Sequence, residues 1–161
     1  MTGQNEFSAL PIEPQKPDSN TLSRVLIVDD ISEMQSTLKR VFRRAGISTV
    51  HSASNIDEAR SMLERAHEYS TPYDIVFVDQ MMPGGSGLDL VEELIARGTE
   101  VVDRRKTGLF ILSGLVEDGF RERVRACGAL DLMEKPVSAE QLLTCCKRWA
   151  QFRAKGKPSA P

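Results

Sequence analysis

The sequence YDIVFVDQMMPGGSG, residues 73–87, decides the fold. Its first half is a run of apolar residues that ends in Asp79, and its second half combines Pro83 with three glycines. A short run without polar alternation is typical of a central strand in a parallel sheet, because both faces of such a strand are buried. The glycines predict a loop that can approach a ligand closely. The stretch therefore predicts a buried strand with a carboxylate at its carboxyl end.

Four further apolar runs lie before and after this one, and each is followed by a segment with apolar residues at helical spacing. These runs are RVLIVD (24–29), ISTVHSA (47–53), GLFILSG (108–114) and ALDLMEKP (129–136). Ser54 precedes the second helical segment as a candidate cap. Strict alternation of strands and helices indicates an α/β fold with helices on both faces of a parallel sheet. We therefore predict a doubly wound, five-stranded parallel sheet.

One folded domain accounts for most of the chain. Residues 1–23 contain several prolines and no apolar periodicity, which predicts a flexible tail. Residues 153–161 are similar, and they form either a second tail or the stub of a linker. The folded unit is therefore predicted over residues 24–152. Within it, the sequence assigns no role to the segment 97–108.

Length and composition limit the classes of protein that remain. The chain has 161 residues, of which 40% are apolar and 27% charged, and its net charge is -2. This balance excludes a generally basic nucleic-acid binder and a polyacidic disordered chain. No apolar run approaches the roughly 18–20 residues of a membrane-spanning helix, and the N-terminus does not resemble a secretory signal. The three cysteines form a poor disulfide framework, so we expect a cytoplasmic protein.

Polar side chains end four of the five predicted strands. Asp29 and Asp30 follow the first strand, Asp79 the third, Ser113 the fourth and Lys135 the fifth. Because the carboxyl ends of parallel strands share one edge of the sheet, we expect these side chains to converge there. Clustered carboxylates repel one another unless a cation lies among them, and Mg²⁺ prefers such oxygen ligands.

This set of groups is suited to phosphoryl transfer. A bound metal ion and the Lys135 ammonium can balance charge on phosphoryl oxygens, and the Ser113 hydroxyl can donate a hydrogen bond to one of them. Asp79 ends the central strand and is the candidate nucleophile. A carboxylate that attacks phosphorus forms an acyl phosphate.

Four segments in order, VLIVDD, DIVFVDQMMPGGSG, FILSG and GALDLMEKP, resemble the response-regulator receiver domain of two-component signalling, the CheY-like family. The resemblance covers Arg24 to Phe152 and implies the flavodoxin-like strand order 2-1-3-4-5. It implies that Asp79 accepts phosphoryl from a histidine kinase or a phosphotransfer protein. It also implies an Mg²⁺ site made by Asp29, Asp30, Asp79 and the backbone carbonyl of Met81.

The resemblance assigns further roles near the ends of the last two strands. Ser113 takes the position of the hydroxyl switch, and Lys135 that of the lysine that pairs with the phosphoryl group or the carboxylate. Pro136 is expected to follow a cis peptide bond. Leu132 stands where many members carry an aromatic residue that moves inward on activation, so an aromatic relay is not expected here.

The resulting expectation is a phosphorylation-activated signalling switch in a phosphorelay. Such a phosphoacceptor domain is not a conventional enzyme, because it catalyses only its own phosphoryl transfer and dephosphorylation. Phosphorylation would alter packing around the fourth helix, the fourth strand and the fifth helix, and so change the binding of a downstream protein partner. We expect no direct contact with nucleic acid or membrane, and a phosphorylation-dependent dimer is left open.

Several alternatives remain at this point. The domain could act as an interaction module without phosphorylation, or as the receiver part of a longer regulator with an output domain. It could also be an Mg²⁺-dependent phosphatase, although the dehalogenase type would require a second Asp where Met81 stands. Asp29 and Asp30, taken alone, could simply cap the first helix.

Overall fold

The computed structural model describes residues 22–155. The predicted tails therefore lie almost wholly outside the described residues. The last helix ends at Lys155, so it continues a little beyond the predicted boundary of the folded unit. Within residues 22–155, no helix has the length and hydropathy needed to span a membrane.

Strands and helices alternate along the chain, as predicted. In order they are β1 (Arg24–Val28), α1 (Ser32–Arg44), β2 (Thr49–Ala53), α2 (Ile56–Glu68), β3 (Ile75–Asp79), β4 (Met81–Met82), β5 (Gly85–Ser86), α3 (Gly87–Ala96), a 3₁₀ helix (Gly98–Glu100), β6 (Gly108–Ser113), α4 (Phe120–Ala126), β7 (Asp131–Glu134) and α5 (Ala139–Lys155).

The main sheet has five parallel strands in the order β2-β1-β3-β6-β7. This arrangement confirms the predicted order, in which the first strand lies between the second and the third. The two-residue strands β4 and β5 pair with each other and form a separate antiparallel ladder. They lie in the glycine-rich loop, where the sequence predicted no strand.

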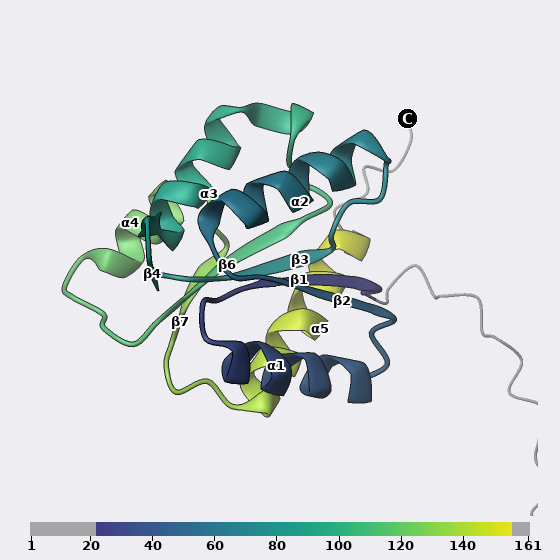
Figure 1. Ribbon diagram of the computed structural model, residues 1–161, viewed down its shortest axis with the longest axis horizontal. Helices are drawn as coiled ribbons and strands as arrows, with labels where there is room; N and C mark the ends of the chain where they lie inside the picture. Colours follow the sequence, from purple (N-terminus) through teal and green to yellow (C-terminus); the bar gives the residue numbers. More distant parts are fainter. Residues whose placement is uncertain (1–21, 156–161) are drawn as a thin grey trace, which may run out of the picture.

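Helices cover both faces of the sheet, with α1 and α5 on one face and α2, α3 and α4 on the other (Figure 1). Alternate residues of each central strand enter opposite cores. In β1, Val25 and Ile27 pack in the core that contains Phe42, whereas Leu26 and Val28 pack in the core that contains Leu63. Burial on both faces explains why this strand is a continuous apolar run.

A partly buried carboxylate joins the sheet to the end of α5. Asp74, just before β3, accepts hydrogen bonds from Ser23 N at 2.7 Å and from Arg24 N at 2.9 Å. Its other carboxylate oxygen lies 2.6 Å from Arg153 Nη1, and its carbonyl accepts a bond from Trp149 Nε1 at 2.7 Å. We call this set the Asp74 cluster. It lies at the amino end of the strands, opposite their carboxyl ends.

The start of α2 differs from the expectation. Asn55, and not Ser54, is the N-cap, and its side chain accepts a hydrogen bond from Glu58 N at 2.8 Å. Ser54 N donates to the Glu58 carboxylate at 2.7 Å. The prediction of Ser54 was wrong by one residue because either residue can cap a helix, and the sequence does not fix where the helix begins.

Candidate functional site

Three carboxylates gather where β1 and β3 end. Oxygen atoms of Asp29, Asp30 and Asp79 lie within 4.8 Å of one another. Asp29 and Asp79 are buried, with 1% and 6% of their surface exposed, whereas Asp30 is exposed. The register of the sheet explains the convergence, because Val28 pairs with Val78 and the two chains then leave the sheet side by side.

The Lys135 ammonium lies beside this carboxylate cluster. Its Nζ is 3.0 Å from Asp79 Oδ1 and 3.5 Å from Asp29 Oδ2. Lys135 follows β7, and its backbone N–H donates to the Ser113 carbonyl at 2.8 Å. The peptide bond between Lys135 and Pro136 is cis. One cation therefore contacts two buried anions at this edge of the sheet.

Opposing effects determine the charge of Asp79. Burial raises the pKa of its carboxyl group, and the neighbouring Asp29 carboxylate acts in the same direction. The Lys135 ammonium and a backbone hydrogen bond from Met81 lower the pKa, but burial outweighs them. The ionised site is therefore short of positive charge, which a divalent cation could supply.

The acidic pair is not a helix cap. The N-cap of α1 is Ile31, and no side-chain hydrogen bond caps this end of the helix. Asp29 Oδ1 accepts a bond from Ile31 N at 2.8 Å, which turns the chain away from β1. Gln35, on the first turns of α1, donates its side-chain amide to the Asp29 carbonyl. The capping alternative is thus excluded, and α1 instead helps to hold the main chain of Asp29.

The glycine-rich loop folds back onto Asp79. Gln80 N donates to the Leu112 carbonyl at 2.8 Å, and Gln80 Oε1 accepts a bond from Leu88 N at 2.9 Å. A Cβ atom on Gly87 would lie 2.6 Å from the Asp79 carbonyl oxygen. Sequence reasoning noted the glycines but missed that Gly87 is required by contact with the Asp79 main chain. The sequence alone does not show which glycine of the loop lies against the Asp79 carbonyl.

Ser113 ends β6 and is buried, with 1% of its surface exposed. Its hydroxyl donates to the Leu115 carbonyl at 2.7 Å and accepts from Leu115 N at 3.3 Å. Ser113 therefore lies at the predicted edge, with its hydroxyl bonded to the following loop. Leu132 on β7 is also buried, at 2% exposure.

Exposed apolar side chains follow three of the polar site residues. Ile31, Met81 and Leu115 are 51%, 74% and 69% exposed. We call these three residues the apolar rim. Each comes one or two positions after Asp30, Asp79 or Ser113, so the loops that carry the reactive groups also carry the rim. Exposed apolar side chains that cluster beside a polar site are typical of protein-binding surfaces.

The donor set fits Mg²⁺. Asp29, Asp30 and Asp79 supply only carboxylate oxygens, and the exposed Asp30 leaves one side of the cluster open to water. Mg²⁺ favours few carboxylate ligands and keeps several of its waters. His51, one of the two histidines in the sequence, is bonded to the Tyr73 hydroxyl at 2.7 Å.

Comparison with known families agrees with this geometry. A model of the response regulator receiver domain matches residues 25–147, so the chain belongs to this family. The protein is therefore a receiver domain of two-component signalling. Members of the family are signalling domains rather than conventional enzymes, and they bind Mg²⁺ at an acidic pocket.

Relatives of known sequence support the same assignment. The chain is 34% identical over 123 residues to the sensory/regulatory protein RpfC of Xanthomonas campestris pv. campestris. It is 31% identical over 119 residues to the response regulator protein PilR of Pseudomonas aeruginosa. Each alignment covers 74% of this chain, but the matched segments are 15% of RpfC and 24% of PilR. The relatives are thus much longer proteins.

Solved structures show the same fold. The chemotaxis response regulator CheY4 of Vibrio cholerae superposes with a TM-score of 0.67 at 22% identity, over 80% of this chain and 99% of CheY4. A receiver domain protein from Clostridium thermocellum gives a TM-score of 0.68 at 24% identity, over 83% and 98% of the two chains.

Proposed function

We propose that Asp79 accepts a phosphoryl group from a phosphohistidine of a histidine kinase or phosphotransfer protein. The observation that carries this proposal is the position of the Asp79 carboxylate, 3.0 Å from Lys135 Nζ and beside the acidic pair. An Asp79 oxygen attacks phosphorus, the P–N bond breaks, and the imidazole keeps the electron pair and takes up a proton. The product is an acyl phosphate on Asp79.

The proposed metal ligands are Asp29, Asp30, Asp79 and the Met81 carbonyl. A bound Mg²⁺ would offset charge on the phosphoryl oxygens. Lys135 contacts Asp79 in the unmodified protein, and after transfer its ammonium is close enough to pair with a phosphoryl oxygen. The Lys135 ammonium would thus pair with the Asp79 carboxylate before transfer and with the phosphoryl group after it.

Ser113 is the proposed switch. A phosphoryl group on Asp79 adds negative charge close to the end of β6, and the Ser113 hydroxyl can donate a hydrogen bond to it. To do so it must give up its bond to the Leu115 carbonyl. The loop after β6 would then move, and the packing of α4 with β7 and α5 would change. A downstream protein partner would read this altered surface.

The apolar rim supports docking of a protein phosphodonor. Ile31, Met81 and Leu115 lie in the loops that carry Asp30, Asp79 and Ser113, and their side chains are more than half exposed. Burial of these side chains against a partner would exclude water from Asp79 during transfer. Because the curated relatives are several times longer, we also keep the proposal that this domain works as the receiver part of a larger regulator. We also propose that phosphorylation of Asp79 can lead two copies of the domain to form a dimer.

The mass of the intact protein after treatment with acetyl phosphate and Mg²⁺ tests this function. We expect a gain of one phosphoryl group in the protein with the wild-type sequence and no gain in Asp79→Asn. Absence of the gain would instead favour an interaction module that works without phosphorylation. Rapid turnover of a chromogenic phosphate ester would favour the Mg²⁺-dependent phosphatase.

A further inference from the structure

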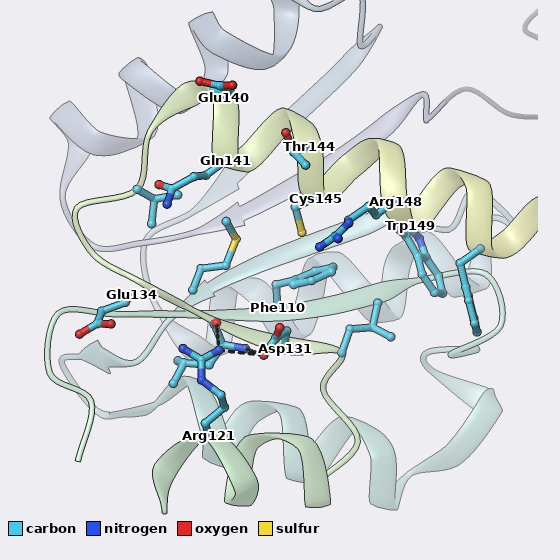
Figure 2. Close-up of a pocket in the computed structure, with 15 residues that line it drawn as sticks. Phe110, Arg121, Asp131, Glu134, Glu140, Gln141, Thr144, Cys145, Arg148 and Trp149 are labelled. Atoms are coloured by element: carbon cyan, nitrogen blue, oxygen red, sulfur yellow. Dashed lines mark hydrogen bonds and ion pairs between the residues drawn. The ribbon is translucent and has the colours of Figure 1, made fainter. Parts of the chain in front are cut away.

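A groove of about 750 Å³ runs beside the edge strand β7. We call it the β7 groove, and its apolar lining includes Phe110, Leu130, Met133 and Trp149. Figure 2 shows α5 along one side of this groove, while Arg121 of α4 points toward β7 from the opposite side. The position of α4 relative to β7 therefore helps to set the shape of the groove.

Side chains cover the free edge of β7. Leu132 N donates to Asp131 Oδ1 at 2.8 Å, and the Leu132 carbonyl accepts from Arg121 Nη1 at 2.8 Å (Figure 2). Arg121 Nη1 also lies 3.0 Å from Asp131 Oδ1, and Arg125 Nη2 lies 3.3 Å from the same oxygen. The Arg121 guanidinium therefore joins the first turn of α4 to the main chain of β7.

A short loop connects this contact to the proposed switch. Ser113 bonds to Leu115 through both the carbonyl and the N–H of that residue, and α4 begins at Phe120. Of the seven residues of α4, Val124 is buried, and Phe120 is partly buried against the same core. A short helix with so few buried contacts is easily displaced. Movement at Leu115 can therefore shift Arg121.

The Leu132 side chain is poorly suited to carry a movement from α4 to β7. It is 2% exposed, lies in the core shared with Val124 and Ala129, and carries no polar atom. Rotation out of this core would leave a cavity and expose apolar surface. The main-chain carbonyl of Leu132, in contrast, is bonded directly to α4. A signal can thus cross from α4 to β7 without movement of the buried side chain.

We propose that the contact between Arg121 and the Leu132 carbonyl is present in the unphosphorylated protein and breaks when Asp79 is phosphorylated. This inference rests on the proposed function, because the phosphoryl group draws Ser113 away from Leu115. The loop then displaces α4, Arg121 leaves β7, and the β7 groove changes shape. A contact that exists in one of two states stabilises that state, so its removal must favour the other by the same free energy.

Beryllofluoride with Mg²⁺, a stable analogue of the phosphoryl group, provides the test. The dissociation constant of beryllofluoride is measured by fluorine NMR for the wild-type sequence, for Arg121→Met and for the control Arg123→Met. Arg123 is exposed and, within residues 22–155, has no ion-pair partner. Partly exposed ion pairs are weak, so we expect Arg121→Met to bind beryllofluoride about 1.5- to 5-fold more tightly. Arg123→Met should match the unmodified protein.

The side-chain N–H signals of Arg121, assigned by their loss in Arg121→Met, give a second readout. They should be protected from exchange in the unmodified protein and lose this protection when beryllofluoride binds. Equal or weaker affinity in Arg121→Met, or unchanged Arg121 signals in a protein that has bound beryllofluoride, would overturn the relay and leave the proposed function intact. If beryllofluoride does not bind and acetyl phosphate adds no mass, the proposed function fails and the relay with it.

Discussion

The Lys135 ammonium contacts Asp79 at 3.0 Å and Asp29 at 3.5 Å, although Lys135 and Asp29 are 106 positions apart in the chain. The contact depends on the whole sheet, because two strands, β3 and β6, separate β1 from β7, the edge strand that Lys135 follows. Two buried carboxylates share one cation, so the site retains excess negative charge. Any change in the charge at this site, by substitution or by a bound cation, should therefore alter both the stability of the fold and the rate of phosphoryl transfer.

Neutralisation of Asp79 should stabilise the fold at neutral pH without Mg²⁺. Because burial raises the pKa of Asp79 in the folded state, the folded protein binds this proton more tightly than the unfolded chain. The ionised carboxylate therefore opposes folding above its unfolded pKa of about 3.9. Urea unfolding should show Asp79→Asn to be more stable than the unmodified protein at pH 7, with the difference lost near pH 3. The exposed Asp118→Asn is the control, and an equal gain there would contradict this cause.

Mg²⁺ should stabilise the protein in proportion to the logarithm of its concentration. At a free concentration one hundred times the dissociation constant, the expected gain in unfolding free energy is about 2.7 kcal/mol. Asp30→Asn removes an exposed proposed ligand, so it should weaken Mg²⁺ binding with little effect on the fold in chelator. Thermal unfolding across an Mg²⁺ titration measures both effects. An unchanged response in Asp30→Asn would exclude this residue from the ligand set.

Removal of the Lys135 charge should slow phosphoryl transfer. Lys135→Met leaves Asp79 without its ammonium partner, and loss of one such electrostatic contact costs about 10²-fold or more in rate. Phosphorylation by acetyl phosphate, followed by intact mass over time, measures this rate. Lys135→Arg keeps the charge and should retain more of the activity. Equal rates in the two variants would show that the charge at this position is not what matters.

Gly87→Ala should destabilise the protein and impair the site. The new Cβ would lie 2.6 Å from the Asp79 carbonyl oxygen, so the main chain at Asp79 must shift. Overpacking of this kind costs about 1–3 kcal/mol. Gly114→Ala is the matched control, because a Cβ there meets no atom within 4 Å. Denaturant midpoints of the two variants should therefore differ clearly.

Asp74→Ala should destabilise the fold without changing the reactive site. The substitution leaves the N–H groups of Ser23 and Arg24 without their acceptor and removes the ion-pair partner of Arg153, which keeps its hydrogen bond to the Lys106 carbonyl. These groups are partly buried, so each lost hydrogen bond should cost about 0.5–1.5 kcal/mol. Urea unfolding measures the loss, and the initial rate of phosphorylation at low temperature should stay unchanged. A large drop in that rate would show that the two ends of the sheet are coupled.

The alternation of apolar runs and amphipathic segments was sufficient to predict the fold, because a parallel sheet leaves its strands no polar face. The same logic predicted that Asp29, Asp30, Asp79 and Lys135 meet, since each ends a strand or lies within two residues of its end. These predictions depend on which residues end the strands, and that information is local in sequence.

Other contacts could not be predicted because they depend on the relative positions of elements that are distant in sequence. Arg121 bonds to Leu132 only because the short helix α4 packs beside the edge strand, and no pattern in the sequence specifies that approach. The β4–β5 ladder has two residues in each strand, which is too short for periodicity. The Asp74 cluster was missed because Asp74 looks like any acidic residue ahead of a strand.

The Asp74 cluster and Asp79 lie at opposite ends of the strands of one sheet, so structural support and the proposed reactivity belong to different parts of the molecule. The charge around Asp79 can change at one end of the strands while hydrogen bonds at the other end hold the starts of β1 and β3 against the last helix. Substitutions of exposed side chains near Asp79 can therefore tune reactivity or partner choice while the hydrogen bonds of the Asp74 cluster stay intact.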